Sequence, residues 1–469
     1  MISSSLQKTL KKAAGIIKKH DYARVISHYD ADGITSAAII CTALNRIGIQ
    51  FHSSIVSKLD RDFIQDLDED LIIICDMGTA QKELISEFLK DKDVIILDHH
   101  AAPMNSSPND TTATSPLIIN SHYFTQEGEE EITGEVCAAG ISYLVARCLA
   151  SAEGTRNIDL AGLAIAGTLG DKLEIKQGIN KLILDEAIEA GVITIRTGLK
   201  LGEGTMRDLL LLSTDPYTPF VGKDEWVDTF LDKAGIEGDK LLSNLEPEDE
   251  KRLITALLSQ AKESEIELPE DALVGTTYNM NVEVVRNGLD FMRMIDACGR
   301  FGKAGIGVGL CMREETMIED ARTLYLKLQN KLVAELNRLE QTDDEGIKEL
   351  PHSFYFYVQQ TGITGVLAGT LAEFIHTNKP LIVFNKKNGT GERAVTKVSA
   401  RCNKKLLVPS ESGDGGIDLA KALEQAANGV GGMGGGHPVA AGASIPKGTE
   451  EQFIASIDRI ISEQKQKLA

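Results

Sequence analysis

The sequence predicts an α/β protein in which an N-terminal parallel-sheet domain is followed by a helical or mixed middle insertion and a C-terminal α/β domain. Three observations predict this class. Short apolar strands alternate with helix-like stretches over the first 170 residues, as is typical of βα units. Longer amphipathic helices and charged loops then follow, and the alternation returns near the C-terminus. A chain of 469 residues also exceeds one hydrophobic core, which stops growing near ~250 to 300 residues, so two or three domains are expected.

The N-terminal elements are short apolar runs separated by segments with helical apolar spacing. The spacing predicts helices at residues 33–46, 80–90, 135–150 and 158–169, the last two rich in Ala and Leu and therefore buried. Strands are predicted at residues 23–27, 51–56, 71–75, 94–97 and 116–119. We expect residues 1–194 to form the first domain.

The pattern changes twice after this domain. Residues 195–350 form a mostly helical middle region with acidic tracts at 246–250 and 343–345. A last domain is expected over residues 351–469. Its predicted elements are strands at 354–358, 381–384 and 394–399 and a helix at 365–376.

The composition is that of a soluble globular protein, at 42% hydrophobic and 25% charged residues. No apolar run approaches the ~18 residues needed to span a bilayer, and lysines from Lys8 onward interrupt the N-terminus where a signal peptide would be apolar. Seven cysteines without a C-x-x-C pair favour reduced thiols over disulfides or a zinc ribbon. We therefore expect a cytoplasmic protein without membrane contact.

The net charge of −20 speaks against a polyanionic partner, but the charge is unevenly distributed. Residues 351–469 hold 13 basic and 10 acidic residues, so all of the excess acid lies upstream of them. Within that segment, residues 379–405 carry eight basic residues and one acid. This basic stretch is a candidate surface for a polyanion.

Three of the early strands end in an acid or in an acid with histidine. The first is followed by Asp30 and Asp32, the third by Asp76, and the fourth by the run 98–100, Asp-His-His. The carboxyl ends of parallel strands share one edge, where open α/β folds bind their ligands. A single Asp there is usually a turn former or a helix N-cap, as Asp32 could be. A cluster of carboxylates needs cations to offset its repulsion, so the set as a whole predicts a metal site.

The ligand types indicate the metal and the chemistry. Asp171, which follows a buried helix, completes enough oxygen and imidazole ligands for two ions. Mixed Asp and His ligation without cysteine favours Mn²⁺ or Mg²⁺ over structural zinc, and the imidazoles favour manganese. Two such ions are the standard device for in-line attack on phosphorus. The sequence therefore predicts hydrolysis of a phosphoester or a phosphoanhydride.

The motifs HYDADG, CDMG, LDHH and GTLGD, followed in order by GGGHPVAAG, resemble those of the DHH phosphoesterase superfamily with its DHH-associated C-terminal domain. The resemblance is closest to RecJ-type single-strand exonucleases and, in chain length and middle region, to their archaeal relatives, the GINS-associated nucleases. The motifs run from residue 28 to residue 445. The resemblance implies a hydrolase of single-stranded nucleic acid that acts in DNA replication or repair.

The resemblance also implies a two-ion centre in which Asp76 bridges two Mn²⁺ ions, with Mg²⁺ as the alternative. One ion would also be bound by Asp30 and His28. The other would also be bound by Asp32, His99 and Asp171. The implied metal ligands are His28, Asp30, Asp32, Asp76, His99 and Asp171.

Three further positions carry implied roles. Asp98 would lie behind His99 and orient its imidazole, and His100 would face the scissile phosphate. Bacterial RecJ and family II pyrophosphatases have a histidine four positions before the first motif Asp, where this chain has Ile26. His28 is the available substitute.

The C-terminal domain would bind the nucleic acid. Glycines of the GGGH run leave backbone N–H groups open to a phosphate, and a bidentate Arg suits a terminal phosphate. The Gly-rich run could instead reflect close packing, and a Lys run is usually a solvated face. The implied phosphate-binding residues are Lys397, Ser399, Arg401, Gly434, Gly435, Gly436 and His437.

Several interpretations remain open at this point. The leading one is a manganese-dependent exonuclease on single-stranded DNA, 5′ to 3′ by resemblance, with RNA as a further substrate. One alternative is an oligoribonuclease or cyclic-dinucleotide phosphodiesterase of the same superfamily. Another is a replication scaffold that binds GINS through the acidic middle region. The run 299–303, Gly-Arg-Phe-Gly-Lys, could contact substrate or form a turn. Polarity, the choice of DNA or RNA and the oligomeric state are not determined by these residues.

Overall fold

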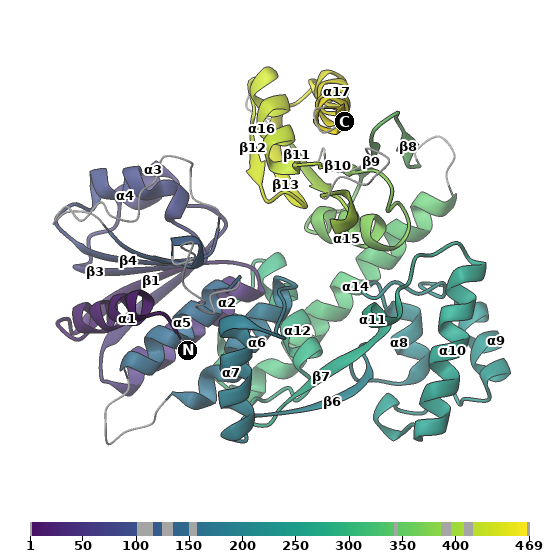
Figure 1. Ribbon diagram of the computed structural model, residues 1–469, viewed down its shortest axis with the longest axis horizontal. Helices are drawn as coiled ribbons and strands as arrows, with labels where there is room; N and C mark the ends of the chain where they lie inside the picture. Colours follow the sequence, from purple (N-terminus) through teal and green to yellow (C-terminus); the bar gives the residue numbers. More distant parts are fainter. Residues whose placement is uncertain are drawn as a thin grey trace. The chain divides into compact units, whose positions relative to one another are not determined.

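The computed structural model describes most of the chain (Figure 1). The acidic tract at 343–345 and part of the basic stretch, Lys386, Lys387 and Arg393, lie outside the described residues. The described residues are 2–100, 116–123, 135–149, 157–341, 346–385, 395–407 and 416–466.

The chain divides into two compact units, each built from two stretches of sequence. Unit 1 comprises Met1–Thr197 and Thr276–Tyr325, and unit 2 comprises Gly198–Gly275 and Leu326–Ala469. Residues of the middle region are therefore distributed over both units. The three-part division into 1–194, 195–350 and 351–469 stays a prediction.

Unit 1 contains a five-stranded sheet and the helices that cover it. Its strands are β1 (Tyr22–His28), β2 (Gln50–Val56), β3 (Leu71–Cys75), β4 (Asp93–Asp98) and β5 (Leu117–Asn120). Its helices are α1 (Ser4–Ile17), α2 (Ala31–Arg46), α3 (Arg61–Gln65), η1 (Thr79–Gln81), α4 (Lys82–Phe88), η2 (Ser121–Tyr123), α5 (Ala138–Leu149), η3 (Ile158–Leu160), α6 (Ala161–Gly170), α7 (Gly178–Glu189), α12 (Gly288–Arg300), α13 (Ala304–Cys311) and η5 (Glu315–Met317).

All neighbouring strands of this sheet are parallel, in the order β2-β1-β3-β4-β5. The register pairs Ser27 with Cys75 and Cys75 with Leu97, so that β1, β3 and β4 end level with one another. The N-terminal parallel sheet is thus confirmed, and the three strand ends that carry acids meet at one edge.

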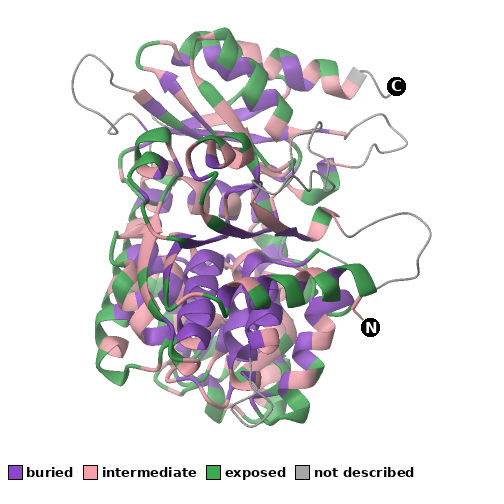
Figure 2. Cartoon of the chain, turned by 90° about the vertical axis from the view of Figure 1, so that its left-hand side faces the viewer, coloured by how far each residue is buried: buried purple, intermediate pink, exposed green. Residues whose placement is uncertain are grey.

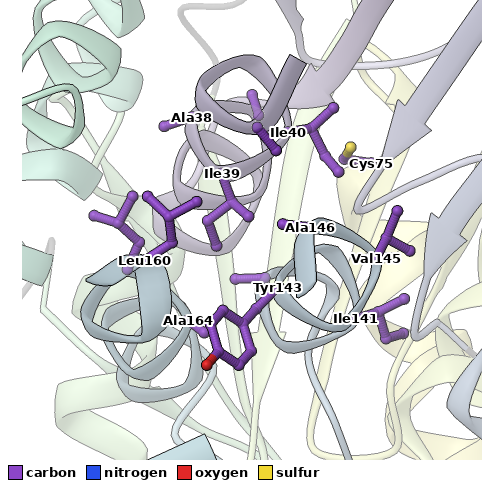
Figure 3. Close-up of a cluster of buried hydrophobic side chains, with 14 of the residues drawn as sticks. Ala38, Ile39, Ile40, Cys75, Ile141, Tyr143, Val145, Ala146, Leu160 and Ala164 are labelled. Carbon is purple, nitrogen blue, oxygen red and sulfur yellow. The ribbon is translucent and has the colours of Figure 1, made fainter. Parts of the chain in front are cut away.

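The core of unit 1 lies mainly between this sheet and the helices α2, α5 and α6. Figure 3 shows apolar side chains of these helices pointing toward one another, among them Ile39 of α2 and Tyr143 of α5. Helix α6 is apolar all round, with eight consecutive buried residues, because it is covered on every side. This packing holds the N-terminus of α2 and the C-terminus of α6 in fixed positions.

Unit 2 combines a helical segment with a six-stranded sheet. Its helices and strands are α8 (Met206–Leu212), α9 (Asp224–Ala234), η4 (Leu242–Asn244), α10 (Pro247–Glu263), α11 (Glu270–Leu273), β8 (Lys348–Glu349), β9 (Phe354–Val358), α15 (Thr364–Phe374), β10 (Leu381–Asn385), β11 (Val395–Arg401), η6 (Lys404–Leu406), α16 (Leu419–Gly429), β12 (Met433–Gly436), β13 (Ala440–Pro446) and α17 (Glu450–Gln466). The chain passes between the units within the paired strands β6 (Ile193–Leu199) and β7 (Val274–Met280) and within α14 (Ile318–Gln341).

The sheet of unit 2 is mixed, in the order β12-β13-β11-β10-β9-β8. Only β9 and β10 run parallel, and the other neighbours are antiparallel. Helix α15 packs on β10 and β11, and α16 packs on β12 and β13. In Figure 2, α17 near the C-terminus alternates purple and green because one side of it is buried against this domain. The predicted C-terminal α/β domain is confirmed.

Helices α1, α7 and α17 and strands β12 and β13 have no counterpart among the predicted elements. Within the described residues, no helix is both long enough and apolar enough to cross a membrane.

Candidate metal centre

The first strand end places two carboxylates through a tight turn. Asp30 is the N-cap of α2, and its side chain accepts a hydrogen bond from the N–H of Gly33 at 3.0 Å. The Ser27 hydroxyl donates to the Gly33 carbonyl at 2.6 Å and closes the turn. Asp32 is therefore not the cap. Its buried carboxylate accepts hydrogen bonds from the N–H groups of Ala138 and Ala139, at 2.8 Å each, at the start of α5.

The third strand end places Asp76 with a backbone conformation that most residues avoid. Its φ is +57°, a region in which Asp is tolerated better than bulky residues, and its N–H donates to the Leu97 carbonyl at 2.8 Å. The side chain is 2% exposed. Among the described residues, neither carboxylate oxygen of Asp76 has a partner in hydrogen-bond geometry. Unsatisfied buried carboxylate oxygens are costly and indicate a ligand.

The fourth strand end brings two histidines to the same place. His99 Nε2 lies 3.2 Å from Asp171 Oδ2, 3.3 Å from Asp76 Oδ1 and 3.8 Å from Asp32 Oδ2. Asp171 comes from the C-terminus of α6, and its Oδ2 is also buried without a hydrogen-bond partner among the described residues. His99 thus stands at the centre of three carboxylates that come from three different elements.

The Asp98 carboxylate forms hydrogen bonds with both histidines. Its Oδ1 accepts hydrogen bonds from the backbone N–H groups of His99, at 2.8 Å, and of His100, at 3.1 Å. The same oxygen lies 2.8 Å from Nδ1 of His100, and Oδ2 accepts from the N–H of Thr79 at 2.9 Å. Sequence reasoning assigned Asp98 to the imidazole of His99. In the structure its side-chain contact is with the imidazole of His100.

The six predicted ligands and His100 form three groups of possible metal ligands. Within each group, the ligand atoms lie within 4.8 Å of one another. One group takes its members from the first and third strand ends. A second takes them from α2, the fourth strand end and α6. A third adds His100 and shares members with both. The groups are His28, Asp30 and Asp76; Asp32, His99 and Asp171; and Asp76, His99 and His100.

Among the described residues, the carboxylates of this cluster outnumber its histidines. Burial raises the pKa of Asp76 well above its usual value, and the charges of Asp30 and Asp32 raise it further. Burial and Asp32 likewise raise the pKa of Asp171. Burial lowers the pKa of His28, but Asp30 and Asp76 outweigh this effect and bring it to about 10. A buried set of carboxylates with orphaned oxygens fits divalent cations, which would neutralise the repulsion and supply the missing partners.

Close backbone packing holds the elements that carry these ligands. A Cβ added at Gly167 of α6 would lie 2.7 Å from Asp32 Oδ1 and 2.6 Å from the Cβ of Ala139. A Cβ added at Gly299 of α12 would lie 1.6 Å from the carbonyl oxygen of Tyr29. Glycine is therefore required at both positions, because a side chain there would displace the loop or the helix that presents a ligand.

The run 299–303, which the sequence left undecided, begins in the last turn of α12 and lies against the loop after β1, since Gly299 packs on the Tyr29 carbonyl. Arg300 forms an ion pair with Asp296, and Asp30 also contributes to raising its pKa, although burial lowers it. The run therefore brings a cation close to the first strand end. The sequence did not identify this neighbour, because Gly299 and Tyr29 lie far apart along the chain.

The phosphate-binding residues predicted near the C-terminus lie in unit 2. Lys397, Ser399 and Arg401 alternate along β11, and the predicted glycines form β12. Arg401 lies against the first turn of α15, since a Cβ added at Gly365 would lie 2.9 Å from its Nη2. The N–H of His437 donates to the Ala440 carbonyl at 2.9 Å and closes the turn between β12 and β13.

Two of the three predicted glycines of this run have internal reasons to be glycine. A Cβ at Gly434 would lie 2.6 Å from the Leu423 carbonyl oxygen of α16, and Gly436 has a φ of +140°. A Cβ at Gly435 would meet nothing within 4 Å. Close packing therefore explains Gly434 and Gly436 but not Gly435.

Comparisons with known proteins identify both domains. Residues 23–168 match the N-terminal domain of the DHH family, and residues 352–463 match the DHHA1 domain. An uncharacterized protein of Methanocaldococcus jannaschii is 29% identical over 459 residues, which cover 96% of this chain and 95% of that protein. The single-stranded-DNA-specific exonuclease RecJ of Thermus thermophilus is 26% identical over 208 residues, 41% of this chain and 29% of the exonuclease.

Solved structures share the fold over nearly the whole chain. The structure of Thermus thermophilus RecJ with Mn²⁺ has a TM-score of 0.59 and 19% identity, and it matches 97% of this chain. This chain spans about half of that exonuclease, 55% of its length. CDC45 from Entamoeba histolytica has a TM-score of 0.66 and 13% identity, with 98% of this chain and 100% of CDC45 covered. The chain therefore contains an N-terminal domain of the DHH family and a C-terminal DHHA1 domain.

Proposed function

We propose that this protein is a metal-dependent exonuclease that hydrolyses the terminal phosphodiester of single-stranded DNA, 5′ to 3′, in replication or repair in the cytoplasm of an archaeon. The observation that carries the proposal is the convergence of His28, Asp30, Asp32, Asp76, His99 and Asp171 on one partly buried cluster. Two Mn²⁺ ions are the proposed cofactors, with Mg²⁺ as the alternative. RecJ of Thermus thermophilus has been solved with each of these ions.

The residues of the site would have different roles in phosphodiester hydrolysis. When bound, the ions would polarise the phosphate and acidify the attacking water. His100, whose side chain is 43% exposed, would donate a hydrogen bond to a non-bridging oxygen or to the leaving oxygen. Asp98 would accept the Nδ1–H of the His100 imidazolium and orient the ring so that its Nε2–H donates to the substrate.

The chain's thiols do not supply a nucleophile to this site. Burial raises the pKa of Cys75, beside Asp76, well above its usual value, and it does the same for Cys137, beside the start of α5. A buried thiol with a raised pKa is a poor nucleophile. Direct attack by water, without a covalent intermediate, is therefore the proposed route.

The DHHA1 domain would bind the strand. Its candidate contacts are Lys397, Ser399 and Arg401 on β11, Gly435 on β12 and His437 in the turn after β12. Cations on an exposed sheet face favour a phosphate backbone, and binding by such contacts weakens as salt is added. Assignment of catalysis to residues 1–194 and of strand binding to residues 351–469 belongs to this proposal.

Nuclease assays on single-stranded DNA with one labelled end test the proposal. With Mn²⁺, Asp76→Asn and His99→Ala should lose essentially all activity, whereas Asp62→Asn, an exposed acid on α3, should retain it. Full activity in either ligand variant would refute the mechanism. Labels on the 5′ or the 3′ end determine polarity, and parallel digests of RNA, pApA and cyclic di-AMP separate the exonuclease from a phosphodiesterase of short substrates.

A second candidate function, a replication scaffold that binds GINS, is favoured by one surface feature. Residues 198–275 carry 18 acidic and 8 basic residues, and Trp226 on α9 is 55% exposed among them. An exposed Trp on an acidic helix is typical of an interface anchor. Co-purification of GINS with the wild type but not with Trp226→Ala would support this function, and equal recovery with both would exclude Trp226 as the anchor.

A further inference from the structure

We infer that the lysine-bearing side of α1 is a nucleic-acid contact, which binds the single strand beyond the part held at the metal centre. This inference rests on the proposed function, because it takes a single strand to be the substrate. It assigns a role to five lysines that belong to none of the motifs described above. We call them the lysine stripe, and they are Lys8, Lys11, Lys12, Lys18 and Lys19.

The lysine stripe is a local excess of positive charge in an acidic chain. Residues 1–20 contain these five lysines and no Asp or Glu, whereas the whole chain has 69 acidic and 49 basic residues. All five lysines are exposed. Within the described part of the chain, none of them forms an ion pair. Like charges three or four residues apart on a helix destabilise it, and a bound polyanion would remove that repulsion.

The lysines lie on one side of α1 and the apolar residues lie on the other. Spacings of three or four residues bring helix positions to the same side, and the stripe repeats at such spacings. The apolar side packs on α5 and β5, and Figure 1 shows α1 beside α5. Because this side is buried in unit 1, α1 cannot insert it into a bilayer, so a lipid surface is disfavoured as the partner. The buried residues are Leu6, Leu10, Ala13, Ala14 and Ile17.

The stripe leads away from the edge of the sheet that carries the metal ligands. Leu6, near the start of α1, lines a small cavity together with Ser121, the residue after β5. The last residue of β5 pairs with Asp98 of β4, so this cavity lies at the carboxyl edge of the sheet. The other end of α1 leads into the amino end of β1. At a rise of about 1.5 Å per residue, Lys8 and Lys18 lie about 15 Å apart along the helix.

Gly15 lies in the middle of the stripe and leaves the helix backbone bare there. It is three residues from Lys12 and Lys18 and four from Lys11 and Lys19, so it shares their side of α1. Gly15 is exposed, its φ is not positive, and an added Cβ would meet nothing within 4 Å. Glycine is less favourable than Ala in a helix, and no packing or turn explains it at this position. A bare backbone between cations allows a phosphate chain to approach closely.

A phosphate backbone has the chemistry that this surface fits. Lysine contacts phosphate as a point charge on a flexible stem, and such contacts position a strand without selecting its sequence. An exonuclease must accept every sequence, so contacts of this kind suit the part of the strand that is not being cleaved. The proposed substrate supplies a row of negative charges that continues from the metal centre, and the stripe supplies a row of cations that begins near it.

Substitution of three lysines tests the stripe. Binding is measured by the anisotropy of a fluorescein-labelled oligo-dT of about 30 nucleotides in EDTA, which prevents cleavage. The slope of log K against log salt should fall by about 2, because each contact to a single strand contributes about 0.7. Affinity at 0.1 M salt should fall by about 10- to 100-fold. The stripe variant combines Lys8→Gln, Lys12→Gln and Lys19→Gln.

The matched control removes three exposed lysines from the acidic helices α9 and α10 and should leave the affinity and the slope unchanged. It combines Lys233→Gln, Lys251→Gln and Lys262→Gln. A stripe variant that binds oligo-dT within twofold of the wild type, with an unchanged slope, would refute the stripe.

Lysine acetylation followed by mass spectrometry identifies the occupant. Bound oligo-dT should protect the stripe lysines of the wild type from an N-hydroxysuccinimide ester, whereas Lys233 and Lys251 should react as in the free protein. Poly-Glu of similar length is the competing probe. Protection by poly-Glu equal to that by oligo-dT would overturn nucleic acid as the occupant and indicate an acidic protein partner.

A further readout separates the stripe from the proposed function. Mn²⁺-dependent hydrolysis of bis(p-nitrophenyl) phosphate, which is too small to reach the stripe, should be equal in the wild type and both variants. Wild-type protein that neither binds oligo-dT nor hydrolyses this ester would overturn the proposed function. If the wild type does both and only the binding test fails, the stripe alone is refuted. If the stripe variant also loses hydrolysis, Lys12→Gln alone decides, and an unchanged salt slope in it refutes the stripe.

Discussion

The Asp98 carboxylate lies 2.8 Å from Nδ1 of the His100 imidazole and also accepts the backbone N–H of the same residue. Burial raises the pKa of Asp98, but the hydrogen bond and the charge of His100 outweigh burial and leave the pKa well below its usual value. Asp98 is thus an ionised anchor that orients His100.

Asp98→Asn should lower kcat on single-stranded DNA by about 10- to 100-fold, because the amide removes the charge that holds the imidazole. Mn²⁺ affinity should change little if the ligand atoms of Asp76 and His99 remain in place. Steady-state kinetics and calorimetric Mn²⁺ titration measure the two effects. A variant with full kcat would contradict the orienting role, and Asp62→Asn is the control for the loss of one acid.

Asp76→Asn should stabilise the metal-free protein. In the absence of cations its buried carboxylate faces Asp30 and Asp32, and the substitution removes one charge without changing the shape. We expect the Tm in EDTA to rise by a few degrees, since about 1 kcal/mol corresponds to ~2–4 °C in domains of 150–250 residues. The stabilisation of the wild type by added Mn²⁺ should disappear in the variant. A lower Tm in EDTA would show that repulsion is not the dominant effect.

Gly299→Ala should disturb the metal centre without touching a ligand. The added Cβ would overlap the Tyr29 carbonyl, so α12 or the loop before Asp30 must move, at a cost of about 1–3 kcal/mol. Urea denaturation and Mn²⁺ affinity should both report the change. Gly305→Ala on α13, where a Cβ meets nothing within 4 Å, should instead be neutral or slightly stabilising.

Asp159→Asn should remove stability that depends on pH. Asp159 accepts hydrogen bonds from Arg46 and Arg313 at 2.7 and 2.8 Å. Burial raises its pKa, but the two guanidinium groups outweigh burial and lower it. Because the folded-state pKa is below the unfolded value, the stabilisation is complete above about pH 4 and is lost as the pH falls toward the folded-state pKa. We expect a loss of about 1 kcal/mol at pH 7, with partial exposure of all three side chains limiting its size.

Urea denaturation of the wild type and Asp159→Asn from pH 7 to pH 3 measures this difference. The gap between the two proteins should narrow below pH 4. A gap that is constant over the range would mean that the carboxylate does not act through its charge.

Arg401→Gln should weaken binding of single-stranded DNA and reduce the slope of log K against log salt by about 1, if Arg401 contacts one phosphate. Anisotropy titrations at several salt concentrations measure the slope. Lys421→Gln, an exposed lysine on α16, should leave the slope unchanged.

The strand ends were the most predictable part of the site. Alternating apolar runs with acids at their carboxyl ends are local patterns, and parallel pairing necessarily aligns those ends. These patterns therefore predict that Asp76 and His99 lie beside one another. The position of Asp171 was harder to predict. Asp171 ends a helix, so its position depends on how α6 packs against α2.

Local sequence patterns did not predict other contacts of the site. Asp30 and Asp32 are equally plausible caps two residues apart, and only the turn through Gly33 assigns the cap to Asp30. The partner of Asp98 depends on which imidazole turns toward it. The side of the sheet on which Gly435 and Gly442 lie depends on the register of three antiparallel strands, two of which the sequence did not predict.

By itself the sequence determined the α/β class, the two terminal domains and the residue types of the metal centre, because periodicity and strand-end chemistry are properties of neighbouring residues. The tertiary structure decided which carboxylates share a histidine, why Gly167 and Gly299 must lack a side chain, and which glycines face outward. Those relationships join residues up to hundreds of positions apart, and they are set by the packing of backbone against backbone at distances of a few ångströms. No pattern along the chain encodes such distances.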